Sequence, residues 1–266
     1  MSDVTRLNQP KIIAIANQKG GVGKTTTAIN LGAALVDDGY NVLLIDLDPQ
    51  GNASTGLGLT PNDRKLTTYD LLLEEAALKD VIHATSIDGF WVAPATTDLS
   101  SADIELVANE KRSFLLHDAL RDPSIDEYAL DYILIDCPPS LSLLTVNAMV
   151  AANSVLVPLQ SEFFALEGLS QLLLTVREVR QTANPKLRIE GVVLTMYDKR
   201  NNLSLQVESD ARDNLNDLVF KTVIPRNVRI SESPSFAVPV LEYDPTSKGS
   251  MAYRALAHEL VDRQSN

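Results

Sequence analysis

The stretch "NQKGGVGKTTT", residues 17–27, has the residue types of a loop that holds phosphate. It nearly fits the pattern G-x-x-x-x-G-K-[ST], except that Gln18 stands where the first glycine belongs and Lys19 follows it. In such a loop the backbone N–H groups of a glycine-rich turn point at one spot, and the dipole of the following helix adds positive potential there. An apolar run precedes the loop and a helical pattern follows it, so the context favours phosphate binding.

Each position of this loop has an expected part in binding a nucleoside triphosphate. The glycines permit the turn, Lys24 would lie along the β- and γ-phosphates, and the Thr25 hydroxyl would complete the coordination of Mg²⁺. We therefore predict one continuous nucleotide-binding segment, made of Gln18, Lys19, Gly20, Gly21, Val22, Gly23, Lys24, Thr25 and Thr26.

Aspartates follow two other apolar runs. "LLIDLDPQGNAST" contains Asp46 and Asp48, and "YILIDCPPS" contains Asp136. Carboxylates at strand ends beside a phosphate loop are placed to hold Mg²⁺, directly or through its waters, and to orient an attacking water. We predict Thr25, Asp46 and Asp136 as the metal site, although an aspartate in the position of Asp136 could instead cap the next helix.

The elements that must position these residues follow a βα alternation. Helical spacing is expected over residues 25–36, 143–151, 166–182 and 250–263, whereas residues 51–63 have the Gly, Asn and Thr content of a functional loop. Strands are predicted from apolar β-branched runs at residues 11–16, 41–46, 90–95, 131–136, 154–159, 189–196 and 220–225. This pattern predicts an α/β fold: a single domain with a mostly parallel, twisted β-sheet and helices on both faces. Ligands of such sheets bind beyond the carboxyl ends of the strands.

Composition limits the possible functions. The chain has 266 residues, 45% of them hydrophobic, which suits one domain. The net charge of −12 argues against coating nucleic acid by bulk attraction, so any DNA contact needs a local basic patch. Cys137 is the single cysteine and is expected to pack as a small apolar side chain. Because there is no signal-peptide pattern and no run of about 18 apolar residues, we expect a soluble, cytoplasmic protein.

The loop sequence K-G-G-x-G-K-[ST] resembles the deviant Walker A motif of the ParA/MinD family of P-loop ATPases. In that family the first lysine, which is Lys19 here, reaches across a dimer interface to the phosphates of the partner subunit. The run "DLDPQGN" resembles the family's second signature, in which the later aspartate, Asp48 here, positions the hydrolytic water. The resemblance thus implies that Lys19, Lys24 and Asp48 are catalytic. It implies a short extension over residues 1–10 and one ATPase domain over residues 11–266.

The carboxyl-terminal half carries further resemblances. "QSEFFALEG", from Gln160, is similar to a family segment that leads into a long helix at the dimer face. Glu162 could cap that helix, which is the preferred interpretation, or contact nucleotide across the interface. The loop "IPRN" is expected to place Pro225, Arg226 and Asn227 against the adenine base. The expected DNA contacts, which could also be ordinary solvated residues, are Lys199, Arg200 and Arg229.

The chromosomal ParA (Soj-like) branch of the family is the most similar. It implies a protein that binds ATP and Mg²⁺, closes into a homodimer, binds double-stranded DNA without sequence preference on the nucleoid, and segregates chromosomes with a ParB-type activator. A relative that positions a plasmid or a chemoreceptor array remains an alternative. So does a small-molecule enzyme of the same fold, similar to dethiobiotin synthetase, although that class should lack Lys19. The mixed charge of residues 251–266 does not favour a membrane-binding helix.

Overall fold

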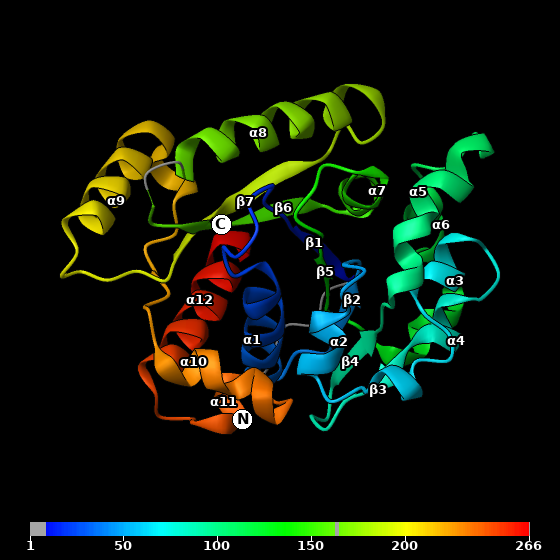
Figure 1. Ribbon diagram of the computed structural model, residues 1–266, viewed down its shortest axis with the longest axis horizontal. Helices are drawn as coiled ribbons and strands as arrows, with labels where there is room; N and C mark the ends of the chain where they lie inside the picture. Colours follow the sequence, from blue (N-terminus) through cyan, green and yellow to red (C-terminus); the bar gives the residue numbers. More distant parts are fainter. Residues whose placement is uncertain (1–8, 163–164, 266) are drawn as a thin grey trace.

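The computed structural model describes residues 9–162 and 165–265. Within these residues the strands form one seven-stranded sheet in the order β3-β4-β2-β5-β1-β6-β7 (Figure 1). All neighbouring pairs are parallel except β3 and β4, which are antiparallel. The strands are β1 (Lys11–Ile15), β2 (Val42–Asp46), β3 (His83–Ala84), β4 (Phe90–Ala93), β5 (Tyr132–Asp136), β6 (Ser154–Gln160) and β7 (Arg188–Thr195).

Helices cover both faces of this sheet (Figure 1). The longer ones are α1 (Lys24–Asp37), α7 (Leu143–Ala151), α8 (Ala165–Thr182), α9 (Asn202–Leu215) and α12 (Lys248–Ser265). The short ones are α2 (Asn52–Gly56), α3 (Thr68–Leu72), α4 (Leu78–Val81), α5 (Ala102–Glu105), α6 (Leu115–Ala119), α10 (Val228–Glu232) and α11 (Val240–Tyr243).

Alternate residues of the strands enter two separate cores. From β1, Ile13 and Ile15 pack with α1 and α12, whereas Ile12 and Ala14 pack on the opposite face with α7 and α8. This arrangement explains why the strands are apolar at nearly every position, since neither face of a doubly covered sheet meets water. The predicted α/β class with a mostly parallel sheet is confirmed.

Two strand predictions need correction. Residues 220–225 form no strand: only Pro225 makes an isolated bridge, although the amide of Phe220 donates to Val192 O and that of Ile224 donates to Leu194 O, both at 2.8 Å. The pairing stops there because the amide of Thr222 donates instead to Glu259, and Pro225 has no amide to donate. Conversely, the two-residue strand β3 was not predicted, since such a short edge strand leaves no periodic pattern.

The predicted helices agree with α1, α7, α8 and α12 to within two residues. The predicted loop over residues 51–63 is wrong in part, because it contains α2. Of the predicted extension over residues 1–10, residues 1–8 lie outside the described residues. In the described part of the chain, no helix is both long and apolar enough to cross a membrane.

Candidate functional site

The glycine-rich loop connects β1 to α1 at the carboxyl edge of the sheet. Gly21 and Gly23 have φ angles of +74° and +87°, in the left-handed region that side chains disfavour, and Gly23 is the residue directly before α1. Asn17 fixes the loop to β6, since its Nδ2 donates to Pro158 O at 2.7 Å while its Oδ1 accepts from the amide of Lys19 at 3.0 Å. The Thr195 hydroxyl donates to Val22 O at 2.8 Å and ties the loop to β7. The turn is therefore held from two strands.

Lys24 is the buried lysine of this loop. Its Nζ donates to the backbone oxygen of Lys19 at 3.1 Å, which folds the side chain back over the turn. Burial lowers the pKa of Lys24, and the negative charges of Asp136 and Asp48 act in the opposite direction. A phosphate bound at this loop would lie beside the buried ammonium group of Lys24 and balance its charge.

Asp46 and Asp136 are the last residues of neighbouring strands and stand directly opposite each other in the parallel register. Both are fully buried. Asp46 is well supported: its Oδ2 accepts from the amide of Ser54 at 2.9 Å and from its hydroxyl at 2.7 Å, and its Oδ1 accepts from the amide of Asp48 at 3.1 Å. Burial nevertheless raises the pKa of Asp46 to about 6.

Asp136 differs from its neighbour, because no hydrogen bond of ordinary geometry reaches either of its oxygens among the described residues, and only the Thr25 hydroxyl is near enough to act as a donor. Burial, and next the negative charge of Asp46, raise the pKa of Asp136 well above its usual value, while Thr25 and Lys24 act against this shift. Two orphaned carboxylate oxygens in a dry site are unusual in a folded protein. They fit a group that brings positive charge or donors to this point.

Mg²⁺ fits this donor set. It takes few protein ligands and usually keeps waters and substrate phosphates around it. The described residues contain no group of three or more His, Cys, Asp or Glu side chains that could hold a metal by themselves. Asp136, with the nearby Thr25, offers the oxygens, whereas both oxygens of Asp46 are already engaged within the protein. Asp46 therefore fits the surroundings of a cation better than direct contact with it.

Asp48 lies two residues beyond the end of β2, so it does not share the strand geometry of Asp46. Its Oδ1 accepts from the amide of Gln50 at 3.0 Å, and its side chain is close to fully buried. The predicted members Gln18, Gly20 and Gly21 of the loop are exposed, while Val22 is buried. Thr25 and Thr26 are half-buried in the first turn of α1.

Two supporting residues were not found from the sequence. Ser54 and Arg64 both come from the Gly-rich segment after β2, and Ser54 bonds Asp46 directly. The guanidinium of Arg64 is buried and donates to Ala95 O, to the Thr55 hydroxyl and to Leu59 O, at 2.7–2.9 Å. The composition of residues 51–63 indicated the segment that contains Ser54 but not the role of its side chain, and Arg64 lies one residue beyond that segment.

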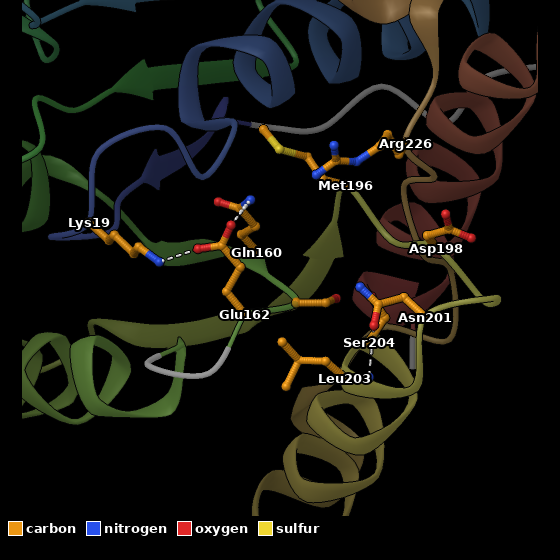
Figure 2. A pocket seen from close by; sticks show the side chains of 10 residues that line it. Lys19, Gln160, Glu162, Met196, Asp198, Asn201, Leu203, Ser204 and Arg226 are labelled. Carbon is orange, nitrogen blue, oxygen red and sulfur yellow. Dashed lines mark hydrogen bonds and ion pairs between the residues drawn. The ribbon is translucent and has the colours of Figure 1, made fainter.

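Lys19 lies at the exposed side of the loop and borders a pocket of 560 Å³ (Figure 2). Its Nζ is 2.7 Å from Oε2 of Glu162, and Oε1 of Glu162 accepts from Nε2 of Gln160 at 2.6 Å. Both carboxylate oxygens thus contact side chains. The preferred interpretation, a cap at the start of α8, stays a prediction, because residues 163–164 lie outside the described residues. Figure 2 shows the Glu162 side chain between Lys19 and the far wall, where Met196 and Arg226 lie.

The "IPRN" loop is divided between two surroundings. Arg226 lines the pocket of Lys19, and Pro225 is paired with Tyr197 in an isolated bridge. Asn227, however, precedes α10, and its side-chain oxygen accepts from the amide of Arg229 at 2.8 Å. The structure therefore brings Arg226 to the same pocket as Lys19, while Asn227 caps a helix.

The three cations predicted to bind DNA lie on exposed loops and helix starts. Lys199 is exposed. Arg200 is 85% exposed and donates two hydrogen bonds of 2.9 and 3.0 Å to Asp198. The hydrogen bonds from Arg200 lower the pKa of Asp198 to about 2. Arg229 pairs with Glu232 at 2.9 Å and with Asp244 at 3.2 Å. Both arginines are thus neutralised within the subunit.

Cys137 is fully buried in the core on the α7 and α8 face, and burial raises the pKa of its thiol. The predicted packing role is confirmed.

Known proteins resemble this chain over nearly its whole length. Residues 10–189 match a family described as an AAA domain. The chromosome partitioning protein ParA of Caulobacter vibrioides (strain NA1000 / CB15N) is 56% identical over 97% of this chain and 96% of its own. The chain belongs to the ParA/Soj family of chromosome partitioning proteins. The sporulation initiation inhibitor protein Soj of Bacillus subtilis (strain 168) is 53% identical over 94% of this chain and 98% of its own.

A solved structure extends the ParA/Soj comparison to bound ligands. The crystal structure named as cobyrinic acid a,c-diamide synthase from Mycobacterium smegmatis, with bound ADP and magnesium, has a TM-score of 0.84 and 37% identity. The match covers 97% of this chain and 96% of that one. The predicted resemblance to the family and the predicted fold are both confirmed.

Proposed function

We propose that this protein is a Mg·ATP-dependent ATPase that dimerises on ATP, binds DNA without sequence preference, and drives chromosome segregation with a ParB-type activator. The observation that carries the proposal is the division of the two lysines of one loop. Lys24 is buried over the turn, whereas Lys19 lies at the loop's exposed side. A cation presented outward can serve a second subunit, which an ordinary phosphate loop does not need.

The nucleotide site follows from the geometry of the loop. Backbone amides of residues 18–26 and the start of α1 bind the phosphates, and Lys24 neutralises their charge. Thr25 and Asp136 hold Mg²⁺, with Asp46 behind them. When bound, the metal ion neutralises charge that develops on the phosphate oxygens. Arg226 and Pro225 approach the base from the far side of the Lys19 pocket, and Asn227 shapes that loop as a helix cap.

Hydrolysis requires a water placed in line with the γ-phosphate. Asp48 is the carboxylate beyond the strand end and takes this positioning role. Lys19 adds positive charge to the phosphates of the partner subunit, so that turnover depends on association. Residues 11–266 then act as a single ATPase domain.

DNA binding needs arginines that are released from their acidic neighbours. Arg200 and Arg229, with Lys199, exchange Asp198, Glu232 and Asp244 for phosphates, and a dimer brings two such sets together. On the net charge of −12, one set by itself would hold DNA weakly. This is why we place the protein on the nucleoid of the cytoplasm only in its ATP-bound form.

The deciding experiment is a DNA-binding titration with ATP, with ADP and without nucleotide. The proposal expects salt-sensitive, sequence-indifferent binding only with ATP. Equal binding in all three conditions, or none in any, would refute it. A neighbouring ParB-type protein that stimulates hydrolysis would favour chromosomes as the cargo over a plasmid or a chemoreceptor array.

A second candidate is an ATP-dependent small-molecule enzyme, favoured by the name of the solved relative from Mycobacterium smegmatis. It is tested by incubating the protein with cobyrinic acid, ATP, magnesium and an amide donor. A diamide product that forms without DNA would support this candidate, and its absence beside ATP-dependent DNA binding would exclude it.

A further inference from the structure

A second pocket, of 630 Å³, lies at the opposite edge of the sheet from the phosphate loop. It is formed by the turn after α1, the start of β4 and the turn that precedes β5, which are all at amino ends of strands. The phosphate loop follows a carboxyl end instead. Because parallel strands place like ends at one edge, this pocket cannot be part of the nucleotide site.

Three aromatic side chains, all half-buried, line the pocket: Tyr40, Trp91 and Tyr128. The rings of Trp91 and Tyr128 meet edge to face, with centroids 5.5 Å apart and an interplanar angle of 75°. Tyr40 makes a similar contact with Tyr132, at 5.2 Å. Such edge-to-face pairs hold the rings in place at the lining of the pocket.

The backbone around the rings is also fixed. Asn41 donates from Nδ2 to Tyr128 O and to Ala129 O, both at 3.1 Å, and its amide donates to Asp131 at 2.9 Å. The backbone amide of Val42 donates to Gly89 O at 2.9 Å, and this bond joins the segment after α1 to the segment before β4. The pocket is therefore largely formed before anything binds.

Two carboxylates complete the lining, Asp88 and Glu127, and both are exposed. Neither has an ion-pair partner within the described part of the chain, and no lysine, arginine or histidine is among the residues that line this pocket. Further out, Asp38 and Asp80 add negative potential at Tyr40 and Tyr128. By contrast, the carboxylates of Asp198, Glu232 and Asp244 already form ion pairs with arginines.

Aromatic faces beside unpaired carboxylates have one common ligand, a cation with an organic body. A guanidinium suits this lining better than an ammonium, since its plane stacks on an indole while its N–H groups reach a carboxylate in pairs. We propose that this pocket binds an arginine side chain of a basic peptide segment, with Trp91 and Tyr128 against the guanidinium and Asp88 and Glu127 as its ion-pair partners. The inference does not depend on the proposed function.

Trp91 makes the test direct, because it is the single tryptophan of the chain and reports on the pocket by its fluorescence. The full-length protein is titrated with a hexa-arginine peptide and, in parallel, with a hexa-citrulline peptide, which has the same shape without charge. We expect a saturable change in Trp91 emission with the arginine peptide alone, weakened by added salt. No change, or the same change with citrulline, would overturn the proposal.

Substitutions separate this pocket from general attraction to an acidic protein. Asp88→Asn and Glu127→Gln should each lower the affinity for the arginine peptide by about three- to fivefold at low salt, which is the effect expected for an exposed ion pair. Glu178→Gln on α8 makes the same charge change at an exposed position elsewhere and should leave the affinity unchanged. An equal loss in all three variants would show nonspecific binding and would overturn the proposal.

A labelled arginine peptide followed by anisotropy extends the test to the ring itself. Trp91→Leu should weaken the binding of this peptide by about fivefold or more, because the cation–π contact is lost while the carboxylates stay. Trp91→Phe keeps a ring face and should recover part of the affinity. Nucleotide binding, measured on the same samples, should be unchanged in every variant, which checks that the fold is intact. Full affinity in Trp91→Leu would contradict the stacked guanidinium.

Discussion

Lys19 and Glu162 form an ion pair 2.7 Å long within one subunit, although 143 residues separate them in the chain. Under the proposed function this contact competes with the one that Lys19 makes across a dimer. The side chains of Lys19 and Glu162 are 38% and 47% exposed, so the pair is screened by water and can be exchanged at small cost. In the single subunit, Glu162 therefore keeps Lys19 in an ion pair that remains accessible to water.

The first prediction concerns this contact. Glu162→Ala should lower the protein concentration needed for ATP-dependent dimerisation by up to about fivefold, because an exposed ion pair contributes at most about 1 kcal/mol. Glu110→Ala is the matched control at an exposed position outside α8. The measurement is light scattering with ATP. Weaker dimerisation would contradict the prediction and would assign Glu162 to the nucleotide of the partner, the alternative left open by the sequence.

Lys19→Ala should abolish ATP-dependent dimers while leaving ATP binding to the monomer, since Lys24 and the backbone amides of the loop stay in place. Lys65→Ala, which removes another lysine from an exposed position, is the control. Light scattering reports the dimer and a labelled nucleotide reports binding. Unchanged dimerisation would refute the role of Lys19 in trans.

Asp48→Ala should trap an ATP-bound dimer by slowing hydrolysis about a hundredfold or more, the usual contribution of a group that directs proton transfer and water. The control Asp213→Ala removes a carboxylate from the exposed side of α9. Phosphate release and the lifetime of the dimer are measured together. Hydrolysis at the normal rate would exclude this carboxylate from the reaction.

Arg200→Glu combined with Arg229→Glu should remove DNA binding but not nucleotide binding. Each lost phosphate contact should also flatten the dependence of affinity on salt. The double change Lys111→Glu and Arg121→Glu alters the net charge equally at exposed positions outside α8. Gel shifts over a salt series distinguish the two pairs. A salt-sensitive shift that persists in the first variant, or an equal loss in both, would contradict the predicted patch.

The buried carboxylates predict a pH dependence. Their pKa values are raised in the folded protein, to about 6 for Asp46, so the folded state binds more protons than the unfolded state just below that value. Without nucleotide and Mg²⁺, stability should fall as pH rises from about 4 through about 6, where Asp46 loses its proton, and should go on falling until Asp136 has also ionised.

Asp136→Asn tests the larger of these contributions. It removes a buried charge whose cost of burial Thr25 and Lys24 offset only in part, so its melting temperature at about pH 8 should exceed that of the unchanged protein by a few degrees, about 2–4 °C for each kcal/mol. Mg²⁺-dependent nucleotide binding should be lost in the same variant. Asp213→Asn serves as control, and a lower melting temperature for Asp136→Asn at about pH 8 would disprove the cost that we assign to its charge.

Much of the fold could be predicted, because buried parallel strands such as β1 and β5 are short, apolar and regularly spaced. Residues 220–225 have the same composition, yet Glu259 from α12 takes the amide of Thr222, a contact that lies outside the local pattern. Likewise the sequence indicated Asp46 and Asp136 as a pair, but not that one is fully bonded and the other has no partner. That difference depends on Ser54, which folds back onto β2 from α2.

The orphaned carboxylate of Asp136 also changes what a melting curve of this protein measures. A fold that keeps two acceptors dry and unbonded is under a local penalty, and any cation or donor that reaches them removes it. Under the proposed function, resistance to unfolding then tracks the supply of nucleotide and magnesium, rising with the logarithm of ligand concentration. When nucleotide and magnesium are depleted, the protein should therefore be less stable and should be degraded more readily by proteases.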